Sequence, residues 1–68
     1  MSLTPRQFGK KLKALREAQG LSQAALGNRS DLTREYINKL EAGRYDPTLG
    51  ALQRLAKALG VKVTALVE

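Results

Sequence analysis

The feature that most constrains this chain is one helix-start signature that occurs three times in 68 residues. In each copy a leucine precedes a serine or threonine, and another apolar residue follows four positions after the hydroxyl residue. The hydroxyl is typical of a helix N-cap, and the two apolar residues form a hydrophobic staple around it. The copies begin at Leu3-Thr4, Leu21-Ser22 and Leu32-Thr33, with Phe8, Leu26 and Ile37 as the second staple residues. This pattern predicts three short helices.

Glycines mark the expected helix ends. Gly20, Gly43 and Gly60 each follow an apolar stripe of helical period, where a left-handed residue commonly ends a helix. A fourth helix begins at either Asp46 or Thr48, a choice that local rules leave open. Its residues at core spacing are Leu49, Leu52, Leu55, Ala56 and Leu59. We therefore expect an all-α, compact bundle of four or five short helices.

Composition limits what such a bundle can do. The chain has no Cys and no His, so the usual general base, thiolate nucleophile and soft metal ligands are missing. We expect no metal, no cofactor and no enzymatic activity. Twelve Lys and Arg against six Asp and Glu give a net charge of +6, which makes a polyanion the first partner to consider.

Length and hydropathy indicate the kind of chain. We expect a single domain over residues 1–68. No apolar run is long enough to span a membrane, and residues 1–11 lack the apolar core of a signal peptide. A membrane-surface helix is disfavoured, since Trp is absent and the apolar stripe of the first helix is needed for the core. A cytoplasmic location is expected.

The segment from about residue 22 to residue 42 has the pattern of a helix-turn-helix. Its two helices are joined by a very short link, and each has only a narrow apolar face. Gly27 is small enough to let the second helix cross close to the backbone of the first. Asp31 stands where the turn needs a left-handed residue, a conformation that Asp tolerates better than most.

Two groups of residues carry a resemblance to a known family. They are Gly20-Leu21-Ser22-Gln23, Leu26, Thr33, Tyr36-Ile37, Leu40-Glu41, Gly43 and Pro47, followed by Leu55-Ala56 and Ala58-Leu59-Gly60-Val61. Their spacing resembles that of the Cro and phage-repressor (XRE-type) family. The resemblance implies a lambda-repressor-like bundle that binds double-stranded DNA as a transcriptional regulator, a repressor encoded by a bacterium or phage and associated with the nucleoid. The family usually has Ala where Gly27 stands, and Gly or Asn where Asp31 stands.

The helix that follows Thr33 is the expected recognition helix. The major groove of B-DNA is about 12 Å wide and admits one α-helix, with its N-terminal side chains at the base edges. Arg34 can bind guanine, Glu35 can accept from a cytosine amino group, and Lys39 can reach guanine or phosphate. Tyr36 can contact a thymine methyl group or a phosphate. The alternatives are that Glu35 serves the helix dipole, that the cations are solvated, and that Tyr36 covers the core edge.

Contacts with the DNA backbone are predicted on both sides of that helix. Ser22 and Gln23 open the preceding helix, where free amides favour an anion, and the resemblance implies that Gln23 also braces the recognition helix. The other predicted backbone contacts are Asn38, Arg44, Tyr45 and Thr48. The resemblance further implies a structural ion pair between Arg16 and Glu41 that ties the first helix to the end of the third.

A lone domain of this size reads few base pairs. We therefore expect a homodimer on a palindromic operator, with half-sites about 34–36 Å apart. The expected dimerisation segment is 61–68, through Val61, Val63, Leu66 and Val67; packing within the chain is the alternative for Val61 and Leu66. A second possible function is a protein-interaction module, such as an antitoxin or adaptor subunit that binds a toxin or a co-regulator.

Overall fold

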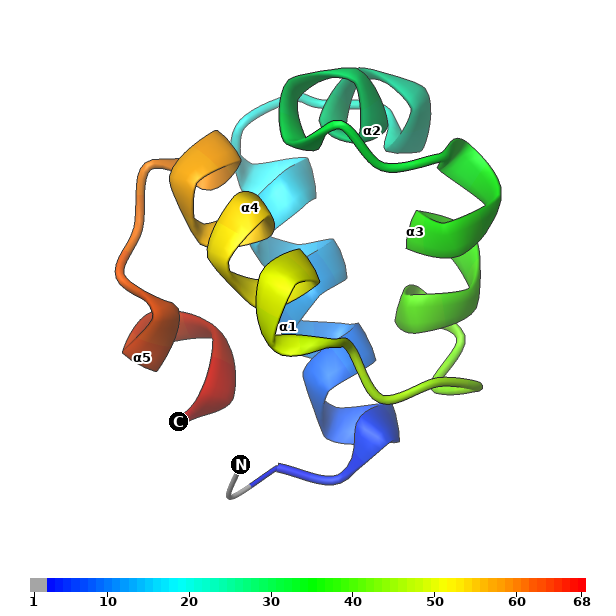
Figure 1. The fold of residues 1–68 in the computed structure, drawn as a ribbon, viewed down its shortest axis with the longest axis vertical. Helices are drawn as coiled ribbons and strands as arrows, with labels where there is room; N and C mark the ends of the chain where they lie inside the picture. Colours follow the sequence, from blue (N-terminus) through cyan, green and yellow to red (C-terminus); the bar gives the residue numbers. More distant parts are fainter. Residues whose placement is uncertain (1–2) are drawn as a thin grey trace.

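A computed structural model describes residues 3–68 and shows an all-helical domain, with no strand among those residues. The helices are α1 (Pro5–Ala18), α2 (Gln23–Ser30), α3 (Arg34–Glu41), α4 (Leu49–Leu59) and α5 (Val63–Val67). They pack into a body of 26 × 22 × 22 Å (Figure 1). The all-α fold predicted from the sequence is confirmed. Met1 and Ser2, which the expected domain includes, lie outside the described residues.

The four longer helices each begin at a hydroxyl cap. Thr4, Ser22, Thr33 and Thr48 each accept a hydrogen bond from the backbone N–H three residues later, at 3.0–3.1 Å. Thr4 also takes part in a reciprocal capping box. The three predicted starts are therefore confirmed. The N-cap of the fourth helix, which was left open between Asp46 and Thr48, is Thr48.

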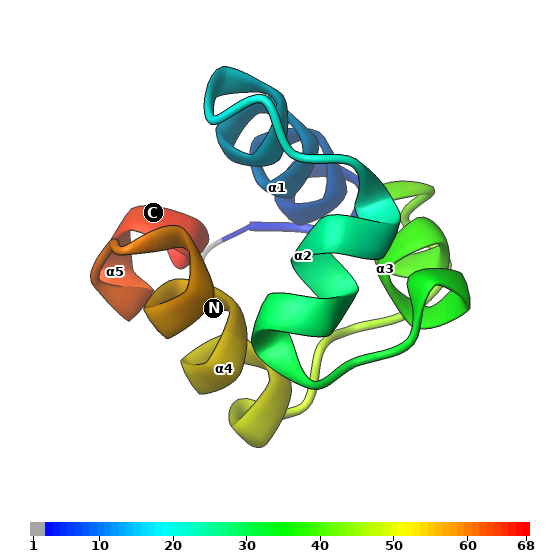
Figure 2. The same ribbon diagram turned by 90° about the horizontal axis from the view of Figure 1, so that it is seen from above.

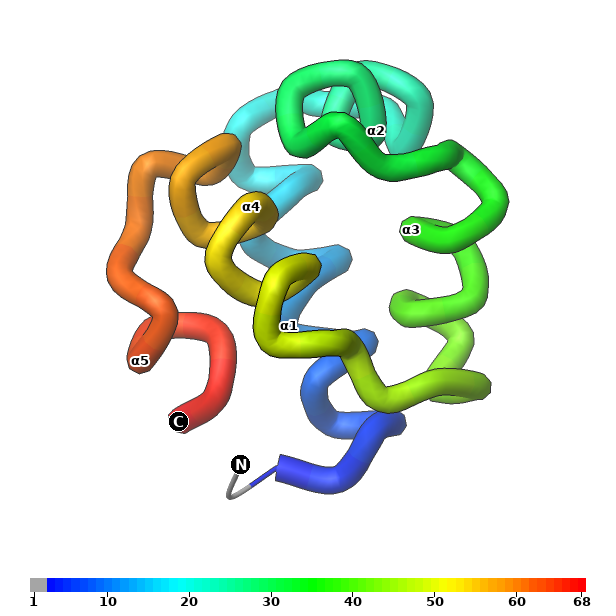
Figure 3. The backbone as a smooth tube through the Cα atoms, in the orientation of Figure 1, coloured from blue at the N-terminus to red at the C-terminus, as the bar shows by residue number. Residues whose placement is uncertain are grey.

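The helices surround one apolar core. Helix α2 lies across one end of the bundle (Figure 1), and seen from above it has α3 and α5 on opposite sides of it (Figure 2). A short turn joins α2 to α3, whereas a longer loop leads from α3 to α4 (Figure 3). The buried core consists of Phe8, Leu12, Leu26, Ile37, Leu40, Leu52, Leu55, Ala56, Leu59 and Leu66. Helices of eight residues are marginal in isolation, so this shared core is what keeps α2 and α3 helical. No helix among residues 3–68 is long and apolar enough to cross a membrane.

Gly9 is the contact point between α1 and α3. A Cβ atom there would lie 2.5 Å from the carbonyl oxygen of Leu40 and 2.6 Å from that of Glu41. A residue with a side chain therefore cannot occupy the position unless one helix moves. This constraint on Gly9 was not predicted. A glycine inside a strong helix pattern costs about 1 kcal/mol relative to alanine, and that cost is a signal of a packing constraint.

One assignment made from the sequence is wrong, and one choice that was left open is resolved. Leu49 was expected in the core, but it is 68% exposed, because it occupies the first turn of α4, beyond the edge of the core. Leu66 was expected either at a dimer interface or packed within its own chain, and the second holds, because it is completely buried there. Helix α5 packs against α1 and α4, and Leu66 is the side chain that it places in the core, so Leu66 is not accessible to a second chain.

Candidate nucleic-acid interface

The turn between α2 and α3 is held by the backbone. Asp31 is the C-cap of α2 and adopts a left-handed conformation, with φ 57° and ψ 41°. Its N–H and that of Leu32 both donate to the carbonyl oxygen of Gly27, the latter at 2.9 Å. The left-handed residue predicted at this position is therefore confirmed, and it turns the chain directly into the cap of α3.

Gly27 allows this turn to close. A Cβ atom on Gly27 would lie 2.6 Å from the carbonyl oxygen of Leu32. Position 27 therefore has no room for a side chain, because α2 and the turn are in tight contact there. The close approach predicted at Gly27 is present, and the backbone that it meets most closely is that of the turn, at Leu32, while the first residue of α3 lies at 3.4 Å.

The outer face of α3 is open to solvent. Ile37 and Leu40 point inward and are fully buried, so helical periodicity turns the other positions outward. Arg34, Glu35 and Asn38 are exposed. A helix with buried residues on one side and uncovered polar residues on the other can enter a groove without unfolding any part of the protein.

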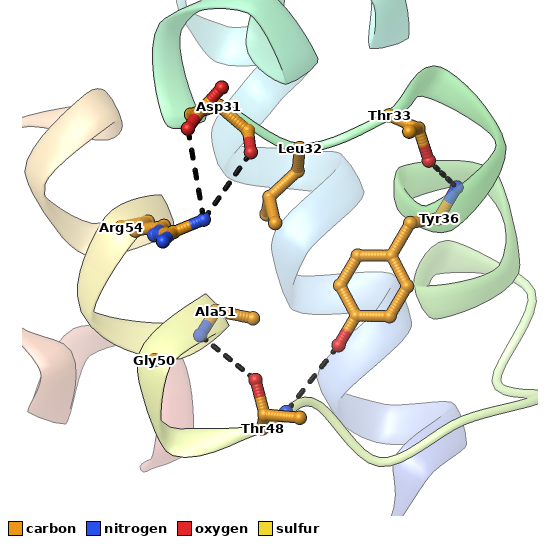
Figure 4. A pocket seen from close by; sticks show the side chains of 8 residues that line it. All are labelled: Asp31, Leu32, Thr33, Tyr36, Thr48, Gly50, Ala51 and Arg54. Atoms are coloured by element: carbon orange, nitrogen blue, oxygen red, sulfur yellow. Dashed lines mark hydrogen bonds and ion pairs between the residues drawn. The ribbon is translucent and has the colours of Figure 1, made fainter.

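Tyr36 and Lys39 differ from these exposed residues because both are half-buried. Tyr36 points from α3 across an open pocket of about 500 Å³ to the start of α4 (Figure 4), where its hydroxyl oxygen accepts a hydrogen bond from the backbone N–H of Thr48 at 3.4 Å. Its ring also packs against the hydrophobic core. Tyr36 therefore covers the edge of the core, as in the second of the two readings left open for it.

Arg54 reaches Asp31 from the other side of this pocket (Figure 4). Its guanidinium Nη1 lies 4.0 Å from the Asp31 carboxylate and 3.4 Å from the Asp31 carbonyl oxygen. Both side chains are largely exposed, so the pair contributes little to stability. It does place a cation beside the negative charge that the turn carries.

A buried ion pair joins α1 to α3. Arg16 Nε donates to Glu41 Oε2 at 2.6 Å, and Arg16 Nη2 donates to Glu41 Oε1 at 2.9 Å. The side chains are only 9% and 4% exposed. The hydrogen bond to Glu41 raises the pKa of Arg16 above its usual value, against the opposing effect of burial. The ion pair that the resemblance implied is thus present, and it is bidentate.

The same pair extends to α2. Arg16 Nη1 donates to the carbonyl oxygen of Leu21 at 2.7 Å, just before α2 begins. Gln23 Nε2 donates to Glu41 Oε1 at 3.1 Å, and Gln23 Oε1 accepts from Asn38 at 3.4 Å. Gln23 thus contacts α3 at two points. The bond between Gln23 and Asn38 was not foreseen, because the two residues are 15 positions apart.

The predicted backbone contacts lie on two flanks of α3. On one flank, Ser22 is exposed and its hydroxyl caps the first turn of α2. On the other, Arg44, Tyr45 and Thr48 are exposed on the loop between α3 and α4 and at the start of α4. The first amides of a helix and a nearby cation are both suited to bind phosphate. The outer face of α3 therefore lies between two groups of candidate anion-binding residues.

Comparison with protein families also identifies a helix-turn-helix. The Helix-turn-helix family model (HTH_3) matches residues 12–66. The chain is 39% identical over 59 residues to the immunity repressor protein of Bacillus phage phi105, an alignment that covers 87% of this chain and 41% of the repressor. It is 41% identical over 59 residues to an uncharacterised HTH-type transcriptional regulator, y4dJ, of Sinorhizobium fredii, with 87% of this chain and 77% of that regulator covered. The chain spans less than half of the phage repressor.

Solved structures show the same fold. The restriction-modification controller protein C.AhdI from Aeromonas hydrophila superposes with a TM-score of 0.89 and 37% identity, covering 91% of this chain and 94% of the controller. A hydroxypropylphosphonic acid epoxidase from S. wedmorenis also matches, with a TM-score of 0.83 and 31% identity, but the match covers 35% of the enzyme. The likeness to the epoxidase is therefore to one segment of it.

Three observations point to one family: the match to the family model, the regulators among the relatives and the geometry of the helix-turn-helix. The matched residues include both helices of the motif and most of the core that supports them. The named relatives are a phage immunity repressor, a transcriptional regulator and a restriction-modification controller protein. The chain belongs to the XRE-type helix-turn-helix family of DNA-binding transcriptional regulators.

Proposed function

We propose that this regulator reads a specific duplex by inserting α3 into the major groove. The observation that carries the proposal is the outward row of Arg34, Glu35 and Asn38 on a helix whose other side is buried. Arg34 and Glu35 lie in the first turn of α3, where a recognition helix meets base edges. Arg34 would bind guanine and Glu35 the amino group of cytosine. Lys39, one turn later, would reach guanine or phosphate, and Tyr36 would contact the groove only with its outer edge.

Contacts with phosphate would fix the register of α3 in the groove. On the α2 side, the exposed Ser22 and the first amides of the helix are suited to bind one strand. Gln23 is bonded to Glu41 and Asn38, so it would brace α3 as well as approach the backbone. On the opposite flank, Arg44 and Thr48 would bind the other strand, and Tyr45 lies next to Arg44 in the same loop.

Arg34 provides the direct test of base reading. Arg34→Ala should reduce the preference for one base pair by about 1–3 kcal/mol, because the bidentate contact to guanine is lost. Arg44→Ala is the matched control, since it removes the same charge from a predicted phosphate contact. It should weaken all duplexes alike and lower the slope of log affinity against log salt by about 1. Binding of each variant to a panel of single-base operator variants measures both effects. Equal loss on every sequence for Arg34→Ala would contradict its assignment as a base reader.

We further propose that the active species is a homodimer on a palindromic operator, with half-sites about 34–36 Å apart. Val61, Val63 and Val67 pack against the core and remain partly exposed, which supports a contribution at the edge of an interface; Leu66 does not contribute. Selection of bound duplexes from a random pool tests this proposal. Two-fold symmetry in the selected sequences is expected, and a single asymmetric site bound by one chain would contradict it.

The action of the protein on DNA would place it in the cytoplasm, at the nucleoid of a bacterium or of the host of a phage. Specific binding should also depend steeply on salt, with affinity falling by about 10³ or more between 50 and 200 mM. Salt-insensitive binding to a toxin or a co-regulator, without preference for a duplex, would instead support an antitoxin or adaptor function.

A further inference from the structure

Three side chains form a cluster between α3 and the loop that follows it. We call them the aromatic cluster: Tyr36 and Lys39 from α3, and Tyr45 from the loop that follows. The ammonium nitrogen of Lys39 lies 5.5 Å from the centroid of the Tyr45 ring. The centroids of the two tyrosine rings are 6.4 Å apart, and the rings are tilted by 30°. Because the Tyr36 hydroxyl also accepts from the N–H of Thr48, the cluster connects α3, the loop and the start of α4.

Lys39 has an unusual partner for a surface lysine. Among residues 3–68 the ion pairs within 4.0 Å are Arg16–Glu41 and Arg54–Asp31, so the ammonium group of Lys39 faces an aromatic ring and not a carboxylate. A carboxylate would neutralise the cation and repel phosphate. A ring attracts the cation through its quadrupole and leaves the positive charge available.

A fixed lysine binds DNA at a smaller entropic cost than a mobile one. The four-carbon stem of lysine has many rotamers, and ordering them on binding lowers affinity. Contact with Tyr45 restricts Lys39 before DNA arrives, which is preorganisation in the usual sense. Tyr45 is itself 45% exposed, so replacing it leaves the core unchanged.

We propose that Tyr45 is a positioning residue for DNA binding: its ring holds the ammonium group of Lys39 in place and joins the loop to the recognition helix. The inference rests on the proposed function, and it adds that Lys39 and Tyr45 act as one unit at the duplex. Tyr45 then affects affinity through Lys39, and the ring matters more than the hydroxyl group.

The first test needs no DNA. In the free protein, proton NMR should show the ε-methylene protons of Lys39 shifted upfield of those of the other lysines, because they lie over the Tyr45 ring. The shift should persist in Tyr45→Phe, which keeps the ring, and disappear in Tyr45→Leu, which removes it. Ordinary lysine shifts in the wild-type protein would overturn the inference whatever the DNA results.

The second test measures affinity for the selected duplex. Tyr45→Leu should weaken binding about two- to fivefold, the value of an exposed cation–π contact, whereas Tyr45→Phe should bind within about twofold of wild type. In a Lys39→Ala background, Tyr45→Leu should have no further effect, since the residue it positions is gone. Lys57→Ala is the matched control for Lys39→Ala, because Lys57 lines a different pocket, beside Arg29 and Ala58. In that background Tyr45→Leu should weaken binding as much as it does in the wild-type protein.

The outcomes separate the two proposals. Independent losses from Lys39→Ala and Tyr45→Leu would mean that Tyr45 contacts DNA by itself, which overturns the positioning role. A loss in Tyr45→Phe as large as that in Tyr45→Leu would assign the effect to a hydroxyl–phosphate bond and would also overturn it. A wild-type protein with the upfield lysine shift but no duplex preference would show that the proposed function has failed while the cluster itself exists.

Discussion

The two ends of this bundle are held together in different ways. Where α1, α2 and α3 meet, the contacts are polar and directional: a bidentate ion pair between Arg16 and Glu41, extended by Gln23. At the other end, α5 has five residues and no side-chain cap, and Leu66 is its one fully buried residue. Directional bonds set an angle between helices, whereas apolar burial requires only proximity. Helix α3 is thus held in orientation, and α5 is only held in place.

The largest expected effect follows from breaking the ion pair. Glu41→Ala should lower the free energy of unfolding by about 3–5 kcal/mol, because it leaves the Arg16 guanidinium buried without a counter-charge. Chemical denaturation followed by circular dichroism measures this loss. A change below 1 kcal/mol would mean that water reaches Arg16 and that the junction is not rigid.

The double variant Arg16→Met/Glu41→Leu is the control for that prediction. It replaces both charges by apolar side chains of similar size, and such replacements are often neutral or stabilising. We expect the double variant to recover the stability lost in Glu41→Ala. We also expect it to bind DNA less well than wild type, because Gln23 then loses its bond to Glu41.

The apolar end should respond locally. Leu66→Ala should cost about 2–3 kcal/mol, near the lower end of the range for buried leucines, because α5 can detach without opening the rest of the core. Amide hydrogen exchange should show lost protection in α5 and unchanged protection in α3. Equal loss of protection in both helices would contradict the difference between the two ends.

A glycine comparison tests the close crossing of α1 and α3. Gly9→Ala should lower stability by about 1–2 kcal/mol, because the overpacking exceeds the gain of about 1 kcal/mol in helix propensity. Gly50→Ala, in α4, makes the same chemical change where a Cβ atom meets nothing within 4 Å. It should raise stability by about 0.5–1 kcal/mol. Thermal melts of the two variants should therefore move in opposite directions.

The smallest effect concerns the missing cap of α5. Lys62 is the N-cap residue and makes no side-chain cap bond. Lys62→Ser should stabilise the protein by about 0.5–1 kcal/mol by supplying that bond. Lys57→Ser removes the same charge inside α4, where no N-cap is possible, and should give no gain. If both variants gain the same stability over wild type, the gain comes from the loss of the charge and not from the new cap.

Much of the fold was predictable because local chemistry determines it. The hydroxyl caps at Thr4, Ser22 and Thr33 and the left-handed Asp31 each depend on residues within one turn. Leu49 was misplaced because helical periodicity identifies a stripe but not how far the core extends along it. Gly9 was missed for a related reason, since its constraint comes from the carbonyl groups of a helix more than 30 residues later.

For the candidate site, too, the features set within one helix were predictable and the contacts between elements were not. The outward direction of Arg34, Glu35 and Asn38 follows from the period of α3 once Ile37 and Leu40 are buried. The bond from Asn38 to Gln23, the hydroxyl contact of Tyr36 with Thr48 and the position of Lys39 over Tyr45 do not follow from it. Each depends on how a loop or a second helix is placed in space.

The amino-acid sequence by itself determined where the first three helices begin and which side of α3 is polar, since caps and periodicity act over a few residues. Only the tertiary structure decided which other distant groups meet: Gln23 with Asn38, Gly9 with the end of α3, and Leu66 with its own core. The physical reason is that these contacts depend on the angles at which helices cross. Those angles result from all contacts of the folded chain at once, from the apolar core as well as from the directional bonds around Arg16.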